Sequence, residues 1–225
     1  MAALWAVYEQ QKSAFAELPD LQQVAQTMDF PLINVLAQME FRGIKIDASK
    51  LEKMNKSLAQ EIAAVQQNIY DMVGYEFNVA SPAQLASALF DKLILPTTRI
   101  KKGKTGYSTN QKELDKLRGQ HPIIELVERF RELSKLQNTY VAALPEQTDA
   151  NGYIHTTFNQ DATATGRLSS TNPNLQNIPI RTELGRQIRD AFVPAPGNVF
   201  VNADYSQFEL RLAAVMAGEK QMIED

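Results

Sequence analysis

Hydrophobic residues recur at helical spacing over most of the chain up to Pro145. The clearest run goes from Leu51 to Met72 in steps that alternate between three and four residues, as on one face of a helix. Asp47 stands before this run, where it can cap the helix, and Gly74 follows it, where a positive φ angle is easily adopted. The pattern therefore predicts one long amphipathic helix.

A single apolar face on a helix of this length needs a partner. The segment from Pro122 to Ala143 carries the same spacing and is the obvious candidate for antiparallel packing. Two such helices would form a projecting stalk. Upstream, shorter helices are predicted up to Leu18, over 21–28 and over 32–39, followed by Gly43 and a short β-like segment at 44–46.

Positive charge is concentrated between the two long helices. The segment from Thr97 to Arg118 contains seven basic residues and only two acidic ones, Glu113 and Asp115. A capped short helix is predicted from Ser81 to about residue 93, and another from residues 108–110 to about residue 119. The stretch 97–106 has no periodicity and predicts a mobile basic loop at the tip of the stalk. Such a loop could follow phosphates, or it could simply be solvated.

Past Pro145 the pattern changes from helical to β and loop. Strands are predicted over 153–158 and 199–203, and a short helix over 182–192. Residues 204–206 then form a turn into an amphipathic helix that ends near Gly218. The predicted fold class is α+β: a helical stalk followed by a part with a β-sheet.

Composition excludes several classes of protein. With 23 basic and 26 acidic residues the formal net charge is −3, and 44% of the residues are hydrophobic, which is typical of a globular chain. The absence of cysteine excludes disulfides and thiolate metal sites, and only His121 and His155 could offer imidazole ligands. The apolar runs are too short to span a bilayer, so we expect a cytoplasmic protein without a membrane partner.

One acid is placed as in many catalytic sites. Asp204 follows a predicted strand and precedes a helix, and its carboxylate oxygens could coordinate a hard cation. Glu209 lies five residues further on and need not share the same ion. The alternative reading is that Asp204 only caps the next helix.

A second candidate site is polar and lacks periodicity. Residues 163–170 and 172–179 combine small residues, hydroxyls, amides and one arginine, which suits a loop that bonds phosphates, sugars and base edges. Arg181, Arg186 and Arg189 add cations nearby. A polar surface loop rich in turn-forming residues would give the same composition.

These segments resemble a known family. Asp204-Tyr205-Ser206-Gln207-Phe208-Glu209-Leu210-Arg211 closely resembles motif A of the A-family DNA polymerases, the bacterial DNA polymerase I type. Residues 163–170 and 174–179 resemble the primer-template-binding segment of that family, and the resemblance extends back through 132–136, 139–140 and 43–47. It implies that residues 1–28 are the tail of an exonuclease-like domain, 29–145 mainly the thumb, and 146–225 the first part of the palm.

The resemblance also implies roles for individual residues. Asp204 and the Tyr205 carbonyl would bind Mg²⁺ in a two-ion site, and Asp204 and Glu209 would be the catalytic residues. Glu209 would crowd the sugar 2′ position, and Ser206, Gln207 and Glu209 would line the dNTP site. The implied contacts to primer-template DNA come from eight residues: Lys101, Lys102, Lys104, Arg167, Asn174, Gln176, Asn177 and Arg181. Two departures from the family pattern are Phe208, where isoleucine is common, and Asp161, where threonine is usual.

The fingers, with their nucleotide-binding helix, and the second metal-binding acid of the family do not occur in these residues. We therefore expect a monomeric polymerase fragment that is inactive alone, in a bacterial-type, nucleoid-associated enzyme. The alternatives are a non-catalytic duplex-binding module, one subunit of a split polymerase, or a helical structural protein with no nucleic-acid partner.

Overall fold

The computed structural model describes residues 2–104 and 106–224. The chain divides into two compact units, residues 1–193 and 194–225, and each unit is described here by itself. Among the described residues, no helix is both long and apolar enough to cross a membrane.

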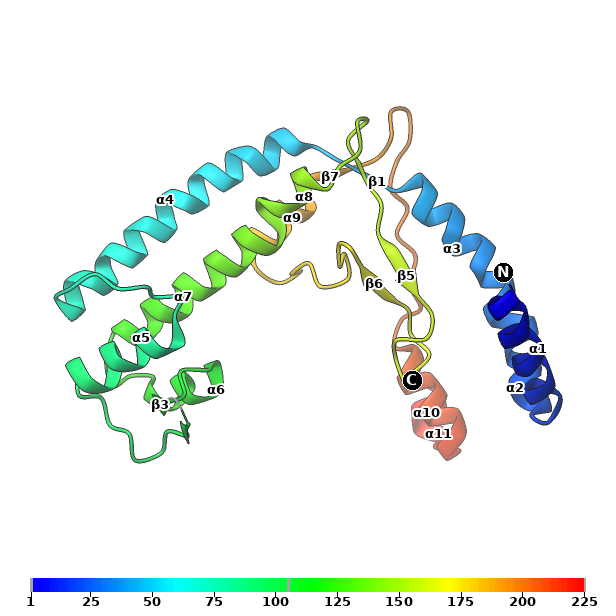
Figure 1. Ribbon diagram of the computed structural model, residues 1–225, viewed down its shortest axis with the longest axis horizontal. Coiled ribbons are helices and arrows are strands. Elements are labelled where there is room, and N and C mark those ends of the chain that lie inside the picture. The colour runs from blue at the N-terminus through cyan, green and yellow to red at the C-terminus, as the bar shows by residue number, and fades with distance from the viewer. Residues whose placement is uncertain (1, 105, 225) are drawn as a thin grey trace. The chain divides into compact units, whose positions relative to one another are not determined.

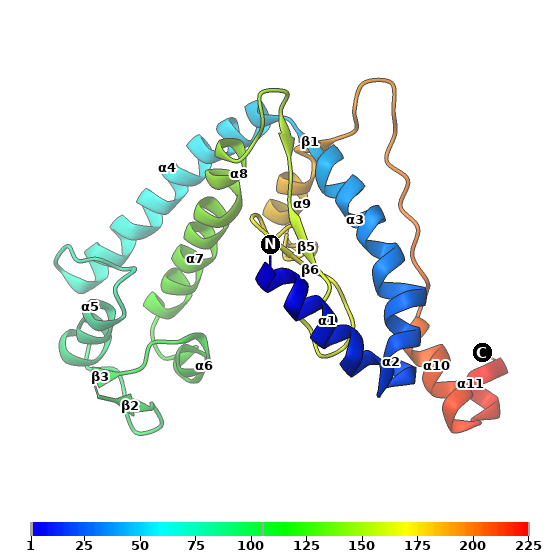
Figure 2. The ribbon, with the colours of Figure 1, turned by 45° about the vertical axis from the view of Figure 1, so that its right-hand side comes forward.

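Two long helices dominate the first unit. Helix α4 (Ala48–Val73) and helix α7 (Ile123–Leu136) lie side by side in Figures 1 and 2. Arg129 of α7 donates to Glu61 of α4, and Gln137, just after α7, donates to Asn55, so the two helices run antiparallel. The predicted pairing is confirmed.

The ends of α4 follow from its flanking residues. The Asp47 carboxylate accepts the Ser49 N–H as an N-cap, and Gly74 has a φ of 88° at the C-terminal end. Helix α7 continues into a π-helical turn, η4 (Gln137–Val141), and a short helix, α8 (Ala143–Glu146). The apolar faces of these helices supply much of the core, including Leu51, Leu58, Ile69, Ile123, Ile124, Val127, Leu133 and Leu144.

The N-terminal helices bury little surface. They are α1 (Ala2–Ala16), α2 (Pro19–Val24), a π-helical turn η1 (Ala25–Asp29) and α3 (Phe30–Arg42). The only buried residues in these helices are Ala25 and Leu36 within the described part of the chain. Gly43 ends α3 with a φ of 63°, and a Cβ there would lie 2.6 Å from the Ile154 carbonyl oxygen, so the position requires glycine.

The helices α4 and α7 form the stalk, and short strands lie at its base, next to the N-terminal end of α4. Strand β1 (Ile44–Ile46) pairs antiparallel with β4 (Tyr153–Ile154) and with β7 (Phe192–Val193) in a three-stranded sheet. Helix α9 (Glu183–Arg189), whose N-cap Thr182 accepts the Gly185 N–H, lies within the short helix predicted over 182–192 and leads into β7. A separate pair joins β5 (Thr157–Asn159) to β6 (Ser169–Thr171).

The predicted strand over 153–158 was wrong as a single element. Strand β4 pairs with β1, whereas β5 pairs with β6, so the chain changes pairing partner at His155 and Thr156. Thr156 is buried and bonds to the Ser170 hydroxyl instead of continuing a ladder. A tertiary contact thus divides a segment whose residue types favour one strand.

The far end of the stalk carries the smaller elements. Helix α5 (Pro82–Ala86) and the π-helical turn η2 (Ser87–Lys92) are followed by strands β2 (Lys102–Gly103) and β3 (Gly106–Tyr107), then by helix α6 (Gln111–Leu114) and a 3₁₀ turn η3 (Asp115–Leu117). The predicted caps Ser81 and Asn110 both accept backbone N–H groups. Within the predicted mobile basic loop over 97–106, β2 pairs with β3 as a short hairpin, with Lys102 opposite Tyr107, and residue 105 lies outside the described residues.

The second unit contains helices α10 (Phe208–Ala217) and α11 (Lys220–Glu224). The strand predicted over 199–203 was wrong, because this segment pairs with no strand of the described residues. A strand needs a hydrogen-bonded neighbour, and Val199 and Val201 are 79% and 84% exposed. Asp204 is therefore not at the end of a strand.

Candidate nucleic-acid interface and metal carboxylate

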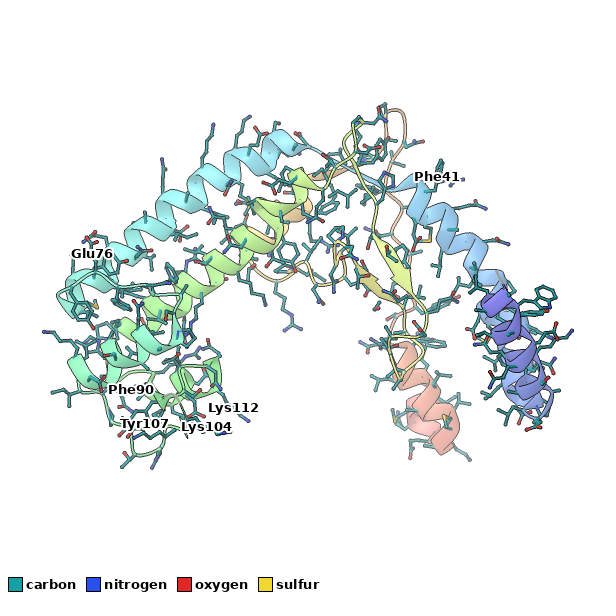
Figure 3. The ribbon with its side chains drawn as sticks, in the orientation of Figure 1. Phe41, Glu76, Phe90, Lys104, Tyr107 and Lys112 are labelled. Atoms are coloured by element: carbon teal, nitrogen blue, oxygen red, sulfur yellow. The ribbon has the colours of Figure 1, made fainter. Side chains whose placement is uncertain are left out.

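The hairpin at the end of the stalk is anchored by an aromatic ring. Tyr107 packs against Phe90 with ring centroids 5.2 Å apart, and the Lys102 ammonium lies 5.1 Å from the Tyr107 ring centroid. Figure 3 shows Phe90, Tyr107, Lys104 and Lys112 at this same end of the molecule. We call residues 97–118 the basic tip.

The positive charges of the basic tip are only partly compensated. Lys116 pairs with Glu113, and Arg118 pairs with Asp115 and Glu128. Hydrogen bonds to Glu128 and the nearby acids raise the pKa of Arg118. The other basic residues are exposed and form no ion pair within residues 2–104 and 106–224: Arg99, Lys101, Lys102, Lys104 and Lys112.

Helix α7 fixes the far side of the basic tip through Arg131. Its guanidinium donates to both the carbonyl and the hydroxyl of Thr109, the residue before the α6 cap. Thr109 is buried, and burial lowers the pKa of Arg131. Sequence spacing did not identify this contact, because it joins residues 22 positions apart.

The polar segment after β6 is organised around two buried hydroxyls. The oxygens of Thr156 and Ser170 lie 2.6 Å apart, and both hydroxyls lie within hydrogen-bond distance of the Pro173 carbonyl. The Ser170 hydroxyl also accepts the Leu175 N–H at 3.1 Å. Sequence analysis included Ser170 in the polar segment but gave no sign that it is buried.

The predicted DNA-contact residue Gln176 is part of the same arrangement. Its side-chain oxygen accepts the Ser170 N–H at 3.2 Å, and its amide nitrogen donates to the Leu168 carbonyl at 3.1 Å. Gln176 thus connects the loop to the segment that follows Arg167. The side-chain oxygen of Asn174 accepts the Gln176 backbone N–H at 3.0 Å.

Tyr140 attaches this loop to the base of the stalk. Its hydroxyl donates to the Asn177 carbonyl at 2.6 Å, and burial raises the pKa of Tyr140. Further on, the Arg181 carbonyl accepts from Arg186, which also pairs with Glu183. The predicted contact residues of this segment are all exposed, namely Arg167, Asn174, Gln176, Asn177 and Arg181.

The structure divides the predicted DNA contacts between two places in the first unit. The lysines of the basic tip lie at one end of the stalk, whereas the loop with Gln176 lies near its other end, where Tyr140 follows α7 (Figures 1 and 2).

The predicted metal carboxylate lies in the second unit. Asp204 and Tyr205 are exposed and precede the turn at Ser206 and Gln207, and the N-cap position of α10 is Gln207, with a φ of 53° and no side-chain cap. The alternative role of Asp204 as a helix cap is therefore excluded. The Ser206 carbonyl accepts from Arg211 at 3.0 Å, and Glu209 lies in the first turn of α10.

Hard oxygen ligands suit Mg²⁺, and both the Asp204 carboxylate and the Tyr205 carbonyl are of this kind. The described residues contain no group of three or more acidic, histidine or cysteine side chains that could hold a metal ion. The donors present therefore fit one part of a magnesium site.

Comparison with known proteins shows the family of the chain. The model of DNA polymerase family A matches residues 48–225. DNA polymerase I of Geobacillus stearothermophilus is 46% identical over 225 residues, which cover 99% of this chain and 25% of that protein. DNA polymerase I of Synechocystis sp. is 46% identical over 209 residues, which cover 92% of this chain and 21% of that protein.

The fold of the chain also matches that of a solved DNA polymerase structure. The POL domain of Pol1 from M. smegmatis, in complex with DNA primer-template and dNTP, matches with a TM-score of 0.84 and 40% sequence identity. The match covers 97% of this chain and 39% of that chain. The present chain spans about a fifth to a quarter of the length of the Synechocystis and Geobacillus stearothermophilus DNA polymerase I chains. It belongs to DNA polymerase family A.

Proposed function

We propose that this chain contributes the thumb and the first part of the palm to a template-directed DNA polymerase, which adds deoxynucleotides to a primer 3′-hydroxyl. The observation that carries the proposal is the basic tip, where five exposed cations have no ion-pair partner among residues 2–104 and 106–224. Exposed cations without an ion-pair partner suit the phosphates of a duplex. Family membership supplies the choice of a polymerase over other DNA-binding proteins.

In this proposal the thumb lysines bind the backbone and the loop near β6 reads the duplex close to the primer end. Lys101, Lys102 and Lys104 neutralise phosphates. The polar side chains of the loop bond to acceptors that all base pairs share in the minor groove, so binding does not depend on sequence. These contacts come from Arg167, Asn174, Gln176, Asn177 and Arg181.

Asp204 and the Tyr205 carbonyl would hold Mg²⁺ in the assembled active site. Bound magnesium neutralises the charge that develops on the transferred phosphate. Glu209 would exclude ribonucleotides by occupying the space of a 2′-hydroxyl, and Ser206 and Gln207 would lie along the dNTP. These roles are supported by the exposure of residues 204–207 and of Glu209 in the first turn of α10.

We further propose a monomer that works in the cytoplasm beside the nucleoid, in keeping with the bacterial relatives. The resemblance assigns only one of two metal-binding carboxylates to these 225 residues. The chain by itself is therefore predicted to give no magnesium-dependent primer extension.

The test is duplex binding by the 225-residue chain at several salt concentrations, measured by the fluorescence anisotropy of a labelled primer-template. The logarithm of the binding constant falls with the logarithm of salt concentration by about 0.9 for each neutralised phosphate. Replacing Lys101, Lys102 and Lys104 with alanine should lower this slope by up to about 2.7, since each contact contributes about 0.9.

The control removes the same charge away from the basic tip. Lys12, Lys53 and Lys56 are exposed on α1 and α4, and their replacement by alanine should leave the slope close to that of the wild type. An equal decrease of the salt slope in the two triple variants would show that binding depends on net charge and not on the basic tip. Binding unaffected by either variant would refute the thumb assignment.

A further inference from the structure

One acidic residue lies inside the basic tip and faces away from solvent. Glu113, in α6, is only 6% exposed. Its Oε2 accepts the backbone N–H of Lys101 at 2.9 Å and the Lys116 ammonium at 2.6 Å. These two bonds, from Lys116 first and Lys101 second, hold the pKa of Glu113 below its ordinary value, so the carboxylate is charged at neutral pH.

Both partners of Glu113 continue the connection into the hairpin. Lys101 accepts the Ser108 N–H at 2.8 Å, which joins the two hairpin strands at their base. Lys116 donates to the Arg99 carbonyl at 2.9 Å, on the stretch that leads into β2. The Glu113 carboxylate thus holds the residues that lead into β2 at two points, directly at Lys101 and through Lys116 at Arg99.

Glu113 is itself fixed in place. Its backbone N–H donates to the Asn110 side chain at 3.0 Å as part of the α6 cap. Next to it, Leu114 is fully buried in the core. A short helix with a packed neighbour therefore supports the carboxylate, and the carboxylate supports the hairpin.

From these contacts we propose that Glu113 is a positioning residue, which orders the lysine-bearing hairpin so that Lys101, Lys102 and Lys104 can bind DNA phosphates together. This inference rests on the proposed function of the basic tip. An acid near a DNA-binding surface ordinarily weakens binding by repulsion, but here the carboxylate is turned inward and its bonds fix the backbone of a cationic hairpin.

The negative charge of Glu113 would weaken duplex binding by repulsion, whereas its positioning of the hairpin would strengthen it. A variant that removes the carboxylate therefore shows which of the two effects dominates. If only charge mattered, Glu113→Ala would remove one negative charge and tighten duplex binding. If the carboxylate positions the hairpin, the same variant weakens binding. The matched control is Asp115→Ala, in the adjoining turn, because Asp115 is half exposed, and its bonds to Gln111 and Arg118 do not reach the hairpin.

The experiment measures duplex affinity and its salt dependence for these variants of the full chain, with a labelled primer-template as the probe. Glu113→Ala should weaken binding by at least about threefold at low salt and lower the salt slope by about 1, one phosphate contact. Glu113→Gln keeps an oxygen that can accept the Lys101 N–H, so it should recover most of the affinity. Asp115→Ala should bind as tightly as the wild type or more tightly.

Hydrogen exchange in the free chain gives a readout that does not depend on DNA. Glu113→Ala should speed exchange at the Lys101 amide, while the Leu133 amide in α7 remains as protected as in the wild type. Unchanged protection of Lys101, or binding by Glu113→Ala as tight as by Asp115→Ala, would overturn the proposal.

The triple lysine variant separates this inference from the function on which it rests. If replacing Lys101, Lys102 and Lys104 does not weaken binding, the proposed function of the basic tip fails. If that variant weakens binding but Glu113→Ala does not, only the positioning role of Glu113 fails.

Discussion

Removing the hydroxyl of Ser170 should loosen the loop that carries Gln176. Ser170 is fully buried, and its hydroxyl meets three groups: Thr156 at 2.6 Å, the Leu175 N–H at 3.1 Å and the Pro173 carbonyl at 3.2 Å. Ser170→Ala deletes a single oxygen, so the change in packing is small. The cost comes from polar groups that lose their partners.

The expected magnitude follows from those groups. A buried N–H left without an acceptor costs about 1–3 kcal/mol, and a lost hydroxyl bond about 1 kcal/mol. Leu175 has no second acceptor among the described residues, whereas Thr156 keeps the Thr171 carbonyl at 3.0 Å. We therefore expect a loss of about 2–3 kcal/mol for Ser170→Ala.

Urea unfolding and hydrogen exchange measure this loss. A cost of about 2 kcal/mol corresponds to roughly 30-fold faster exchange at the Leu175 amide if the loop opens locally. Ser169→Ala is the matched control, because the Ser169 hydroxyl accepts only a long bond from Asn159, at 3.4 Å, among the described residues, and its loss should cost within about 0.5 kcal/mol. Duplex affinity should fall with Ser170→Ala and not with Ser169→Ala.

A double-mutant cycle tests the reasoning itself. Thr156→Val keeps the side-chain shape and removes the other hydroxyl, so the two changes should couple by about 1 kcal/mol. Additive effects, or a Ser170→Ala variant as stable as Ser169→Ala, would show that the buried hydroxyls do not hold the loop.

Four further results are expected. Gly185→Ala should displace the loop before α9 and lower stability, because the new Cβ would lie 2.5 Å from the Pro179 carbonyl oxygen; a thermal melt equal to the wild type would contradict this. Leu133→Ala, fully buried between the long helices, should cost about 2–5 kcal/mol in urea unfolding. Asp204→Ala should leave duplex binding nearly unchanged but abolish primer extension in an enzyme reconstituted with this chain. A large loss of duplex binding would contradict the proposed role of Asp204 in metal binding. Hydrogen bonds from Lys116 and Lys101 lower the pKa of Glu113 in the folded chain below its ordinary value of 4.5. The stability that the carboxylate contributes should therefore be present above that value and be lost as pH falls through the lower folded-state pKa, which acid unfolding of the wild type and of Glu113→Gln would reveal.

The stalk was predictable because its signals are local and repeated. Asp47, Gly74 and the spacing of apolar residues between them set the bounds of α4, and the matching pattern on α7 identified its partner. The two errors about strands have a common cause: a strand depends on a neighbour that its own residues do not encode. Residues 199–203 have the right composition but no pairing partner among the described residues.

The site could be predicted only in part, for similar reasons. Motif resemblance named the exposed residues, such as Asp204 and Gln176, and those roles stay predictions. The groups that hold the exposed residues in place are Glu113, Arg131 and the Thr156–Ser170 pair. Each of them acts through contacts between residues 12 or more positions apart. Only packing brings such residues together, so no short motif contains them.

The most direct test of the DNA-binding role is chemical acetylation of lysines in the presence and absence of a primer-template duplex, read by mass spectrometry. The account predicts strong protection of Lys101, Lys102 and Lys104 by the duplex, with Lys12, Lys53 and Lys56 modified equally in both samples. Two results would contradict the assignment of the basic tip as a duplex-binding thumb: protection of the control lysines on α1 and α4, or equal modification of the three lysines of the basic tip with and without DNA.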